Sequence, residues 1–319
     1  MRYLNEQHVQ SIQTGWDELI KEIGKTVEIM NRGDYAQPVK PYLRYRNQQN
    51  RIIAMPAYVG GDVNIAGIKW IASFPQNIKN GLPRAHSVVV LNDADTGVPV
   101  CIFNTALISI LRTCAVSGLM IKEYLEARPS YRLNVGIIGW GPVGRHHYQM
   151  CKTVLGDRID KILLFDIITD MLYQSLPDDP RVVACDNWEN VFESSDIFIT
   201  CTVSSSRYID RRPKTGSLLL NVSLRDYQPS ILDYTKAIVV DDWDEVCREN
   251  TDIEYFHLHY GLKSSQVKSI RDVVCAKYFH MLSPGEPIFF NPMGMAVFDV
   301  AVAKLFFTRA VSGNVGIEL

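Results

Sequence analysis

The apolar and polar positions divide the chain into a β-rich region, a stretch of alternating strands and helices, and a final apolar helix. Short apolar runs bounded by turn residues are typical of buried parallel strands, and in the middle stretch they cover 135–138, 161–165, 197–203, 217–222 and 237–241. Apolar residues at helical spacing predict helices over 13–31, 106–125, 145–155 and 294–309. Shorter β-like runs predict an antiparallel region ahead of the middle stretch, at 51–56, 65–73 and 87–92.

This order of elements predicts an α/β fold class. A Rossmann dinucleotide-binding domain should occupy 128–287, since strands and helices alternate there. A helix that follows a Rossmann unit often returns to the preceding domain. We therefore expect a discontinuous α+β domain made of 1–127 and 288–319.

The strand at 135–138 leads directly into Gly139-Trp140-Gly141-Pro142-Val143-Gly144, and a helix follows. In such a loop the first glycine permits a tight turn, the second lets the backbone approach a pyrophosphate, and the third lets the helix pack closely on the strand. Asp166 ends the next predicted strand, 166 − 144 = 22 residues after the last glycine, near the spacing of about 20 typical of the acid that binds an adenine ribose. No arginine follows it to neutralise a 2′-phosphate. The motif therefore predicts dinucleotide binding, with NAD rather than NADP as the cofactor. The alternative is a purely structural glycine turn.

Composition narrows the possible partners. Hydrophobic residues make up 47% of the chain and charged residues 21%, with a net charge of −2, which argues against nucleic acid or an anionic membrane as the partner. The most apolar late stretch, 293–307, is interrupted by Asp299 and Lys304 and is too short to span a bilayer. The seven cysteines include no CxxC pair. They are typical of reduced thiols, so we expect a cytoplasmic protein.

The histidines predict no metal site. His257 and His259 are separated by one residue, but no third ligand accompanies them at a suitable spacing. His146 and His147 follow the glycine loop, and we expect them on the surface of the helix rather than as ligands.

Four cations and one carboxylate are candidates for binding or catalysis. Lys69 stands in an otherwise apolar predicted strand, where its ammonium must find an anion or lose its proton. Arg112 lies in an apolar helix, and Lys40 and Arg44 lie in an extended segment with two prolines. Asp226 follows a predicted parallel strand, at the edge where ligands bind in open α/β sheets. The structural alternatives are a snorkelling lysine, an ion-paired arginine, ordinary surface cations, and a turn or helix-capping aspartate.

Several of these segments occur together in one known family: Gln37 to Lys40, Met55-Pro56, Gly67 to Lys69, Leu111 to Ser117, the glycine loop, Thr200 to Val203 and Gly294 to Val297. On these segments the chain resembles the ornithine cyclodeaminase and mu-crystallin family over nearly its full length. Longer signals are similar to the dehydrogenases of 2,3-diaminopropionate biosynthesis in siderophore and antibiotic pathways: Lys40 to Arg44, Arg51 to Pro56, Val240 to Trp243, Cys247 to Glu249 and Asn291 to Ala296.

The resemblance implies a homodimer in which the N-terminal domain, closed by the C-terminal helix, supplies the dimer interface and the substrate pocket. It also implies NAD-dependent oxidation of N-(1-amino-1-carboxy-2-ethyl)-glutamate and hydrolysis of the imine to 2-oxoglutarate and 2,3-diaminopropionate. This amino-acid-derived polycarboxylate has three carboxylates, which lysine and arginine side chains can pair. The alternatives are an ornithine cyclodeaminase or ketimine reductase, or a non-enzymatic NAD(P)-binding protein.

The resemblance also implies roles for single residues. Lys69 matches the lysine beside the reacting amine, and Arg112 matches the arginine that binds a substrate carboxylate. Lys40 replaces an arginine of the cyclodeaminases and keeps a point charge; with Arg44 it is expected to bind substrate. Asp226 matches the aspartate that moves a proton, and it is expected to be the general base. Three further residues are expected to line the cofactor: Thr113, Thr202 and Val203.

Overall fold

The computed structural model describes all of residues 1–319, which form two compact units. Unit 1 comprises 1–115 and 294–319, and unit 2 comprises 116–293. Each unit contains one eight-stranded sheet, and the sheet of unit 2 is parallel throughout. The predicted α/β class and the discontinuous first domain are confirmed. None of the helices combines the length and the apolar character needed to cross a lipid bilayer.

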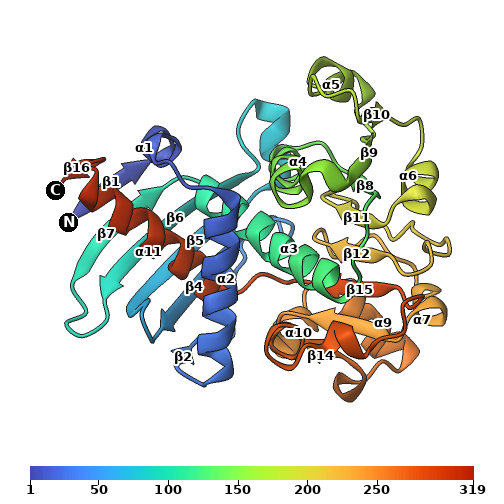
Figure 1. The fold of residues 1–319 in the computed structure, drawn as a ribbon. Helices are drawn as coiled ribbons and strands as arrows, with labels where there is room; N and C mark the ends of the chain where they lie inside the picture. The colour runs from blue at the N-terminus through green and yellow to red at the C-terminus, as the bar shows by residue number, and fades with distance from the viewer. The chain divides into compact units, whose positions relative to one another are not determined.

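The sheet of unit 1 has the order β16-β1-β7-β6-β5-β4-β2, and β3 also pairs with β4. Its strands are β1 (Arg2–Asn5), β2 (Tyr35–Ala36), β3 (Tyr42–Leu43), β4 (Arg51–Val59), β5 (Ile65–Ser73), β6 (Ala85–Asp93), β7 (Pro99–Asn104) and β16 (Ile317–Glu318). Its helices are α1 (Glu6–Ser11), α2 (Trp16–Asn31), the 3-10 turn η1 (Pro75–Asn80), the start of α3 (Leu107–Ala127) and α11 (Ala296–Ser312). Helices α2 and α11 lie side by side against one face of the sheet, so the C-terminal helix completes the core of unit 1 (Figure 1).

Register decides which residues of this sheet face the helices. Met55 pairs with Lys69, and Lys69 pairs with Val89. Met55, Lys69 and Val89 are all buried. Because side chains alternate between the two faces of a sheet, Lys69 lies on the face that α11 covers.

The opposite face of the same sheet is apolar and only half-buried. One row across four strands joins Pro56, Ile68, Val90 and Ile102, none of which is fully buried. Trp70 on this face is 44% exposed. A half-buried apolar sheet face of this kind is typical of a protein interface.

The sheet of unit 2 has the order β10-β9-β8-β11-β12-β15-β13-β14. Its strands are β8 (Leu133–Ile138), β9 (Ile159–Phe165), β10 (Val182–Ala184), β11 (Ile197–Thr200), β12 (Leu218–Asn221), β13 (Ala237–Val240), β14 (Lys268–Ser269) and β15 (Ile288–Asn291). Its helices are the end of α3, α4 (Pro142–Leu155), α5 (Thr169–Gln174), α6 (Trp188–Ser194), α7 (Ile231–Tyr234), α8 (Trp243–Val246), α9 (Asp252–Tyr260) and α10 (Ile270–Ala276), with 3-10 turns η2 (Gly156–Arg158), η3 (Ser264–Gln266) and η4 (Tyr278–Met281). The order reverses between β8 and β11, and at such a switch point ligands bind beyond the carboxyl ends of the strands.

Some boundaries differ from those expected from the sequence. Residues 288–291 were assigned to the first domain, but they form β15, which pairs with β12 and β13 in the sheet of unit 2. The division between the units falls inside α3, after Ala115 rather than 127. Helix α4 begins at Pro142 instead of Arg145, since proline at a first helical position loses no hydrogen bond.

Candidate functional site

The glycine loop has the geometry that the sequence predicts for each glycine. Gly139 has φ +90°, and a Cβ there would lie 2.5 Å from the carbonyl oxygen of Cys201. A Cβ on Gly144 would lie 2.1 Å from the carbonyl oxygen of Gly139, whereas one on Gly141 would meet nothing within 4 Å. The first and third glycines are thus required by packing, and the second faces open space. Together with the amino end of α4, where Val143 and Gly144 follow Pro142, this loop can accommodate a pyrophosphate.

Asp166 connects this loop to the end of β9. Its Oδ2 accepts a hydrogen bond from the backbone N–H of Trp140 at 2.6 Å, and its Oδ1 accepts one from the N–H of Ile168 at 2.8 Å. Each carboxylate oxygen has a further lone pair that can accept a ribose hydroxyl. The side chain is therefore held beside the loop in the place where a Rossmann fold binds the adenine ribose.

Asp226 lies in the same unit, in the turn that follows β12. Its side chain has 0% exposure. The hydroxyl of Thr202 donates to Oδ1 and that of Ser223 donates to Oδ2. Burial and the Asp226 charge raise the pKa of the Tyr208 phenol, which also hydrogen-bonds this carboxylate. Thr202 and the exposed Val203 follow β11, whose end packs on the glycine loop, so Asp226 is joined directly to the dinucleotide site.

A second carboxylate, Asp252, supports the turn that carries Asp226, and the sequence did not single it out. Its Oδ2 accepts the backbone N–H groups of Asp226 and Tyr227, both at 3.1 Å. Its Oδ1 accepts a bond from Nε of Arg207 at 2.7 Å. Burial raises the pKa of Asp252 to about 6. Leu224 in the same turn has φ +67°, which is uncommon for a non-glycine residue and recurs at functional sites.

In unit 1, the structure brings Lys69 and Arg112 to one carboxylate, that of Asp299. Nζ of Lys69 lies 2.7 Å from Oδ2, and Nε of Arg112 lies 2.9 Å from Oδ1. Lys69 is 1% exposed and Asp299 0%. Burial lowers the pKa of Lys69 to about 7, although the Asp299 charge acts in the opposite direction. The sequence showed Asp299 only as an interruption of an apolar helix. A carboxylate in the first turn of such an apolar helix is the signal that could have identified it.

Lys40 joins the same group of cations through Gly294. Its Nζ donates to the carbonyl oxygen of Gly294 at 2.7 Å, and its side chain is buried. A Cβ on Gly294 would lie 2.7 Å from Nη1 of Arg112. Lys40 and Arg112 thus both contact the backbone that leads into α11.

The other predicted residues of unit 1 are placed differently. Arg44 is exposed and stacks over the ring of Tyr42, 5.1 Å from its centroid. The hydroxyl of Thr113 donates to the carbonyl of Ser109 one turn earlier in α3, at 2.7 Å.

His147 does not lie on the helix surface, contrary to expectation. It is buried, with Nε2 2.9 Å from the hydroxyl of Ser117 and Nδ1 2.9 Å from the carbonyl of Val143. Burial lowers its pKa to about 4, so it is neutral near pH 7. Its two ring nitrogens thus link α3 to the first turn of α4. The side chain is buried because the face of α4 that carries it packs against the rest of unit 2.

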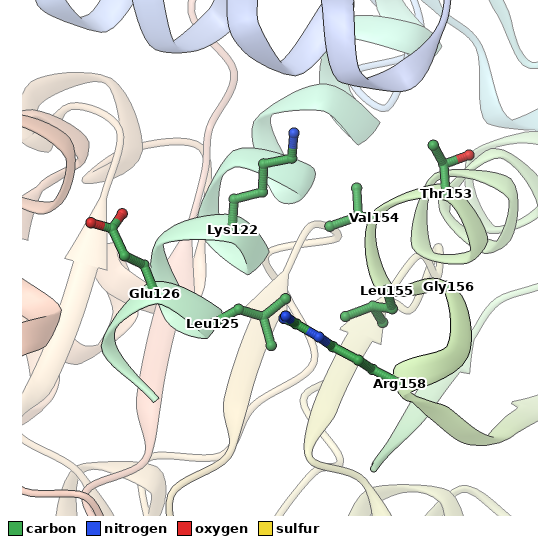
Figure 2. A pocket seen from close by; sticks show the side chains of 8 residues that line it. All are labelled: Lys122, Leu125, Glu126, Thr153, Val154, Leu155, Gly156 and Arg158. Atoms are coloured by element: carbon green, nitrogen blue, oxygen red, sulfur yellow. The ribbon is translucent and has the colours of Figure 1, made fainter. Parts of the chain in front are cut away.

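A hollow of about 510 Å³ lies at the other end of α4 (Figure 2). Its lining comes from α3 (Lys122, Leu125, Glu126), the end of α4 (Thr153, Val154, Leu155) and η2 (Gly156, Arg158). The 14 residues of α4 separate it from the glycine loop by about 20 Å. This hollow is therefore not part of the dinucleotide site.

Comparison with known proteins identifies relatives that match this chain over its full length. N-((2S)-2-amino-2-carboxyethyl)-L-glutamate dehydrogenase of Staphylococcus aureus is 28% identical, over 100% of this chain and 98% of its own length. The structure of Thermococcus litoralis Δ1-pyrroline-2-carboxylate reductase, in complex with NADH and L-proline, superposes with a TM-score of 0.88 at 23% identity and covers 100% of both chains. An archaeal alanine dehydrogenase dimer with bound NAD gives a TM-score of 0.87 at 23% identity, covering 100% of this chain and 98% of that one.

The two solved structures share the fold of this chain. The profile of one protein family, described as ornithine cyclodeaminase/mu-crystallin, matches residues 3–314, which is nearly the whole sequence. The chain therefore belongs to the ornithine cyclodeaminase/mu-crystallin family.

Proposed function

We propose that this protein is an NAD-dependent dehydrogenase that oxidises a CH–NH bond of an amino-acid-derived substrate. The observation that carries the proposal is the link from the glycine loop through Thr202 to Asp226. It supplies a buried carboxylate beside a dinucleotide loop, within one compact unit. Relatives and structural neighbours with NAD-dependent activities on amino and imino acids support the same reaction class.

The residues of unit 2 fit NAD. Open space at Gly141 leaves room for the pyrophosphate, and Asp166 can accept a ribose hydroxyl. Pro142, Val143 and the amino end of α4 would hold the phosphates, and Val203 would contribute an apolar surface. When bound, NAD supplies the redox chemistry by taking a hydride from the carbon that carries the amine.

We assign the substrate to polycarboxylates, and specifically to N-((2S)-2-amino-2-carboxyethyl)-L-glutamate. Lys69, Arg112 and Lys40 converge within unit 1, and pairing carboxylates with cations offsets the cost of removing them from water. The Staphylococcus aureus relative is named for this substrate. Hydrolysis of the imine would yield 2-oxoglutarate and 2,3-diaminopropionate, a precursor for siderophores or antibiotics.

Each residue then has a distinct task. Arg112 binds a substrate carboxylate, and Lys40 adds a second positive charge. Lys69 holds the reacting centre through its ammonium. Asp226 accepts the proton of the amine or of the water that attacks the imine, and two hydroxyl groups fix both of its oxygens for this task. Arg44 and Thr113 remain candidates for the substrate and the cofactor, respectively.

We further propose that the protein is a homodimer in the cytoplasm. The uncovered apolar sheet face around Ile68 and Trp70 supports a second copy as its occupant, as does the dimeric alanine dehydrogenase of the same fold. The seven free cysteines agree with a reducing compartment.

The test is the appearance of NADH when purified protein and NAD are mixed with N-((2S)-2-amino-2-carboxyethyl)-L-glutamate, L-ornithine, L-proline or L-alanine. We expect NADH together with 2-oxoglutarate and 2,3-diaminopropionate, identified by mass spectrometry, from the first compound only. Proline and ammonia from ornithine without net NADH would identify a cyclodeaminase instead. NADH from L-proline would identify a cyclic imino acid reductase acting in reverse, and NAD binding without turnover of any compound would favour a binding protein.

A further inference from the structure

The start of α11 collects the cations of unit 1. Gly294, just before the helix, accepts a hydrogen bond from Lys40 and packs against the Nη end of Arg112. Asp299, in the first turn, contacts Lys69 and Arg112 through different oxygens, and Ser109 lies 3.4 Å from Oδ1. These cations come from three separate parts of the chain, and each of them contacts Gly294 or Asp299. The short segment that carries these two residues therefore determines how the cations are placed.

The position of Asp299 leaves the binding end of Arg112 available. Asp299 uses only Nε of the guanidinium, and Nη1 and Nη2 lie against Gly294, where the missing side chain leaves room for them. These two nitrogens form the pair that binds a carboxylate with two parallel hydrogen bonds. A side chain at position 294 would occupy this space.

Asp299 also favours the charged form of Lys69, against the effect of burial. Three charged groups face its ammonium: Asp299 from α11, Arg112 from α3, and Lys40 from the segment before β3. Its neighbours in the sheet, Met55 and Val89, do not titrate. Of the three charges, only that of Asp299 raises the pKa of Lys69, while burial and the two cations lower it to about 7.

We propose that Asp299 is a positioning residue that holds Lys69 and Arg112 as one anion-binding pair and keeps Lys69 protonated when a carboxylate ligand binds. This inference deepens the proposed function, since it concerns how the same cations bind a polycarboxylate. One buried carboxylate sets both the orientation of Arg112 and the protonation of Lys69. Asp299 acts through these two side chains and does not contact the ligand.

The experiment measures binding of glutarate, a plain dicarboxylate, to the full chain by calorimetry over a range of pH. In the parent protein, affinity should fall as pH rises through about 7, where Lys69 loses its proton. Asp299→Asn should move this inflection to lower pH, because the charge that supports the ammonium is gone. Affinity near neutral pH should drop by about tenfold or more, because removing one partner of a buried, hydrogen-bonded charge pair weakens binding strongly.

Two further variants make the result specific. Asp95→Asn removes an exposed aspartate of the same unit and should change neither affinity nor inflection. Asp299→Glu keeps the charge but displaces it, so the inflection should stay near that of the parent while affinity falls. It also provides the test if Asp299→Asn does not fold.

The proposal is overturned if folded Asp299→Asn keeps the parent inflection, if Asp299→Glu binds glutarate as the parent does, or if the parent does not bind glutarate. Glutarate has no amine to oxidise, so the measurement does not depend on turnover. A shifted inflection without any NADH formation would support Asp299 as a positioning residue and reject the proposed reaction.

Discussion

Alanine at Gly141 and at Gly144 should separate the ligand-binding role of the glycine loop from its packing role. At Gly141 the backbone has φ −75°, which alanine adopts freely, and a Cβ would meet nothing within 4 Å. Gly141→Ala should therefore leave stability unchanged or raise it by about 0.4–1 kcal/mol, through the lower entropy of the unfolded chain. The added methyl group would point into the space we assign to the pyrophosphate. NAD affinity should fall about tenfold or more, which corresponds to roughly 1.4 kcal/mol.

At Gly144 the same substitution should lower stability, whereas at Gly141 it should lower NAD affinity. The Cβ would lie 2.1 Å from the carbonyl oxygen of Gly139, and ordinary contact begins at 3.4 Å, so the loop and α4 must separate by 3.4 − 2.1 = 1.3 Å. Overpacking of this kind costs about 1–3 kcal/mol. For a domain of this size we expect the melting temperature to fall by about 2–4 °C for each kcal/mol.

Thermal unfolding followed by circular dichroism and titration with NADH followed by its fluorescence measure the two effects on the same samples. The reasoning requires that Gly141→Ala loses affinity at unchanged stability and that Gly144→Ala loses stability. Gly141→Ala that binds NADH like the parent would remove the pyrophosphate from this loop. Gly144→Ala as stable as the parent would show that packing of α4 on the carbonyl of Gly139 does not require a glycine at position 144.

Three further predictions concern the other groups of the site. Asp226→Asn should lower kcat by about 10²–10⁴-fold at unchanged NAD affinity, with the exposed Asp210→Asn as control; full activity would exclude Asp226 as the general base. The unfolded chain keeps the Lys69 proton up to its ordinary pKa of 10.5, but the folded chain loses it at about 7. The contribution of Lys69 to the free energy of unfolding therefore rises as the pH rises from about 7 to 10.5. Measured by urea unfolding, the parent should gain about 2–3 kcal/mol over Lys69→Met between neutral pH and roughly pH 9, and parallel curves would contradict this. Trp70→Glu should convert a dimer to a monomer in light scattering, whereas Tyr131→Glu, at an exposed site of unit 2, should not; a parent already monomeric would refute the proposed interface.

Local patterns were enough to identify most of the strands and the long helices. Strand β5 occupies the predicted range, because its apolar run is bounded by turn residues. The short strands β1 and β16 were missed, since β1 has four residues and β16 two, too few for a periodic pattern. Strand β15 was assigned to the wrong domain. Its pairing with β12 and β13 depends on contacts between distant parts of the chain.

The dinucleotide loop was predictable for a similar reason. Its glycines, the acid at Asp166 and the strand that precedes the loop lie close together in sequence, and the steric demands of the turn act on single residues. His147 shows where this approach fails. A histidine beside an exposed loop predicts a surface position, but the fold places it against Ser117 of α3.

The sequence by itself determined the Rossmann unit, the nucleotide motif and the presence of a lysine in an apolar strand, since each follows from the spacing of neighbouring residues. Only the tertiary structure decided what Lys69 meets. Its partner Asp299 is 230 positions away, in the C-terminal helix, which follows unit 2 in the sequence but packs on the sheet of unit 1. Asp252 likewise supports Asp226 from 26 positions away. A buried charge must be paired to be stable, but spacing along the chain does not indicate which distant residue pairs it.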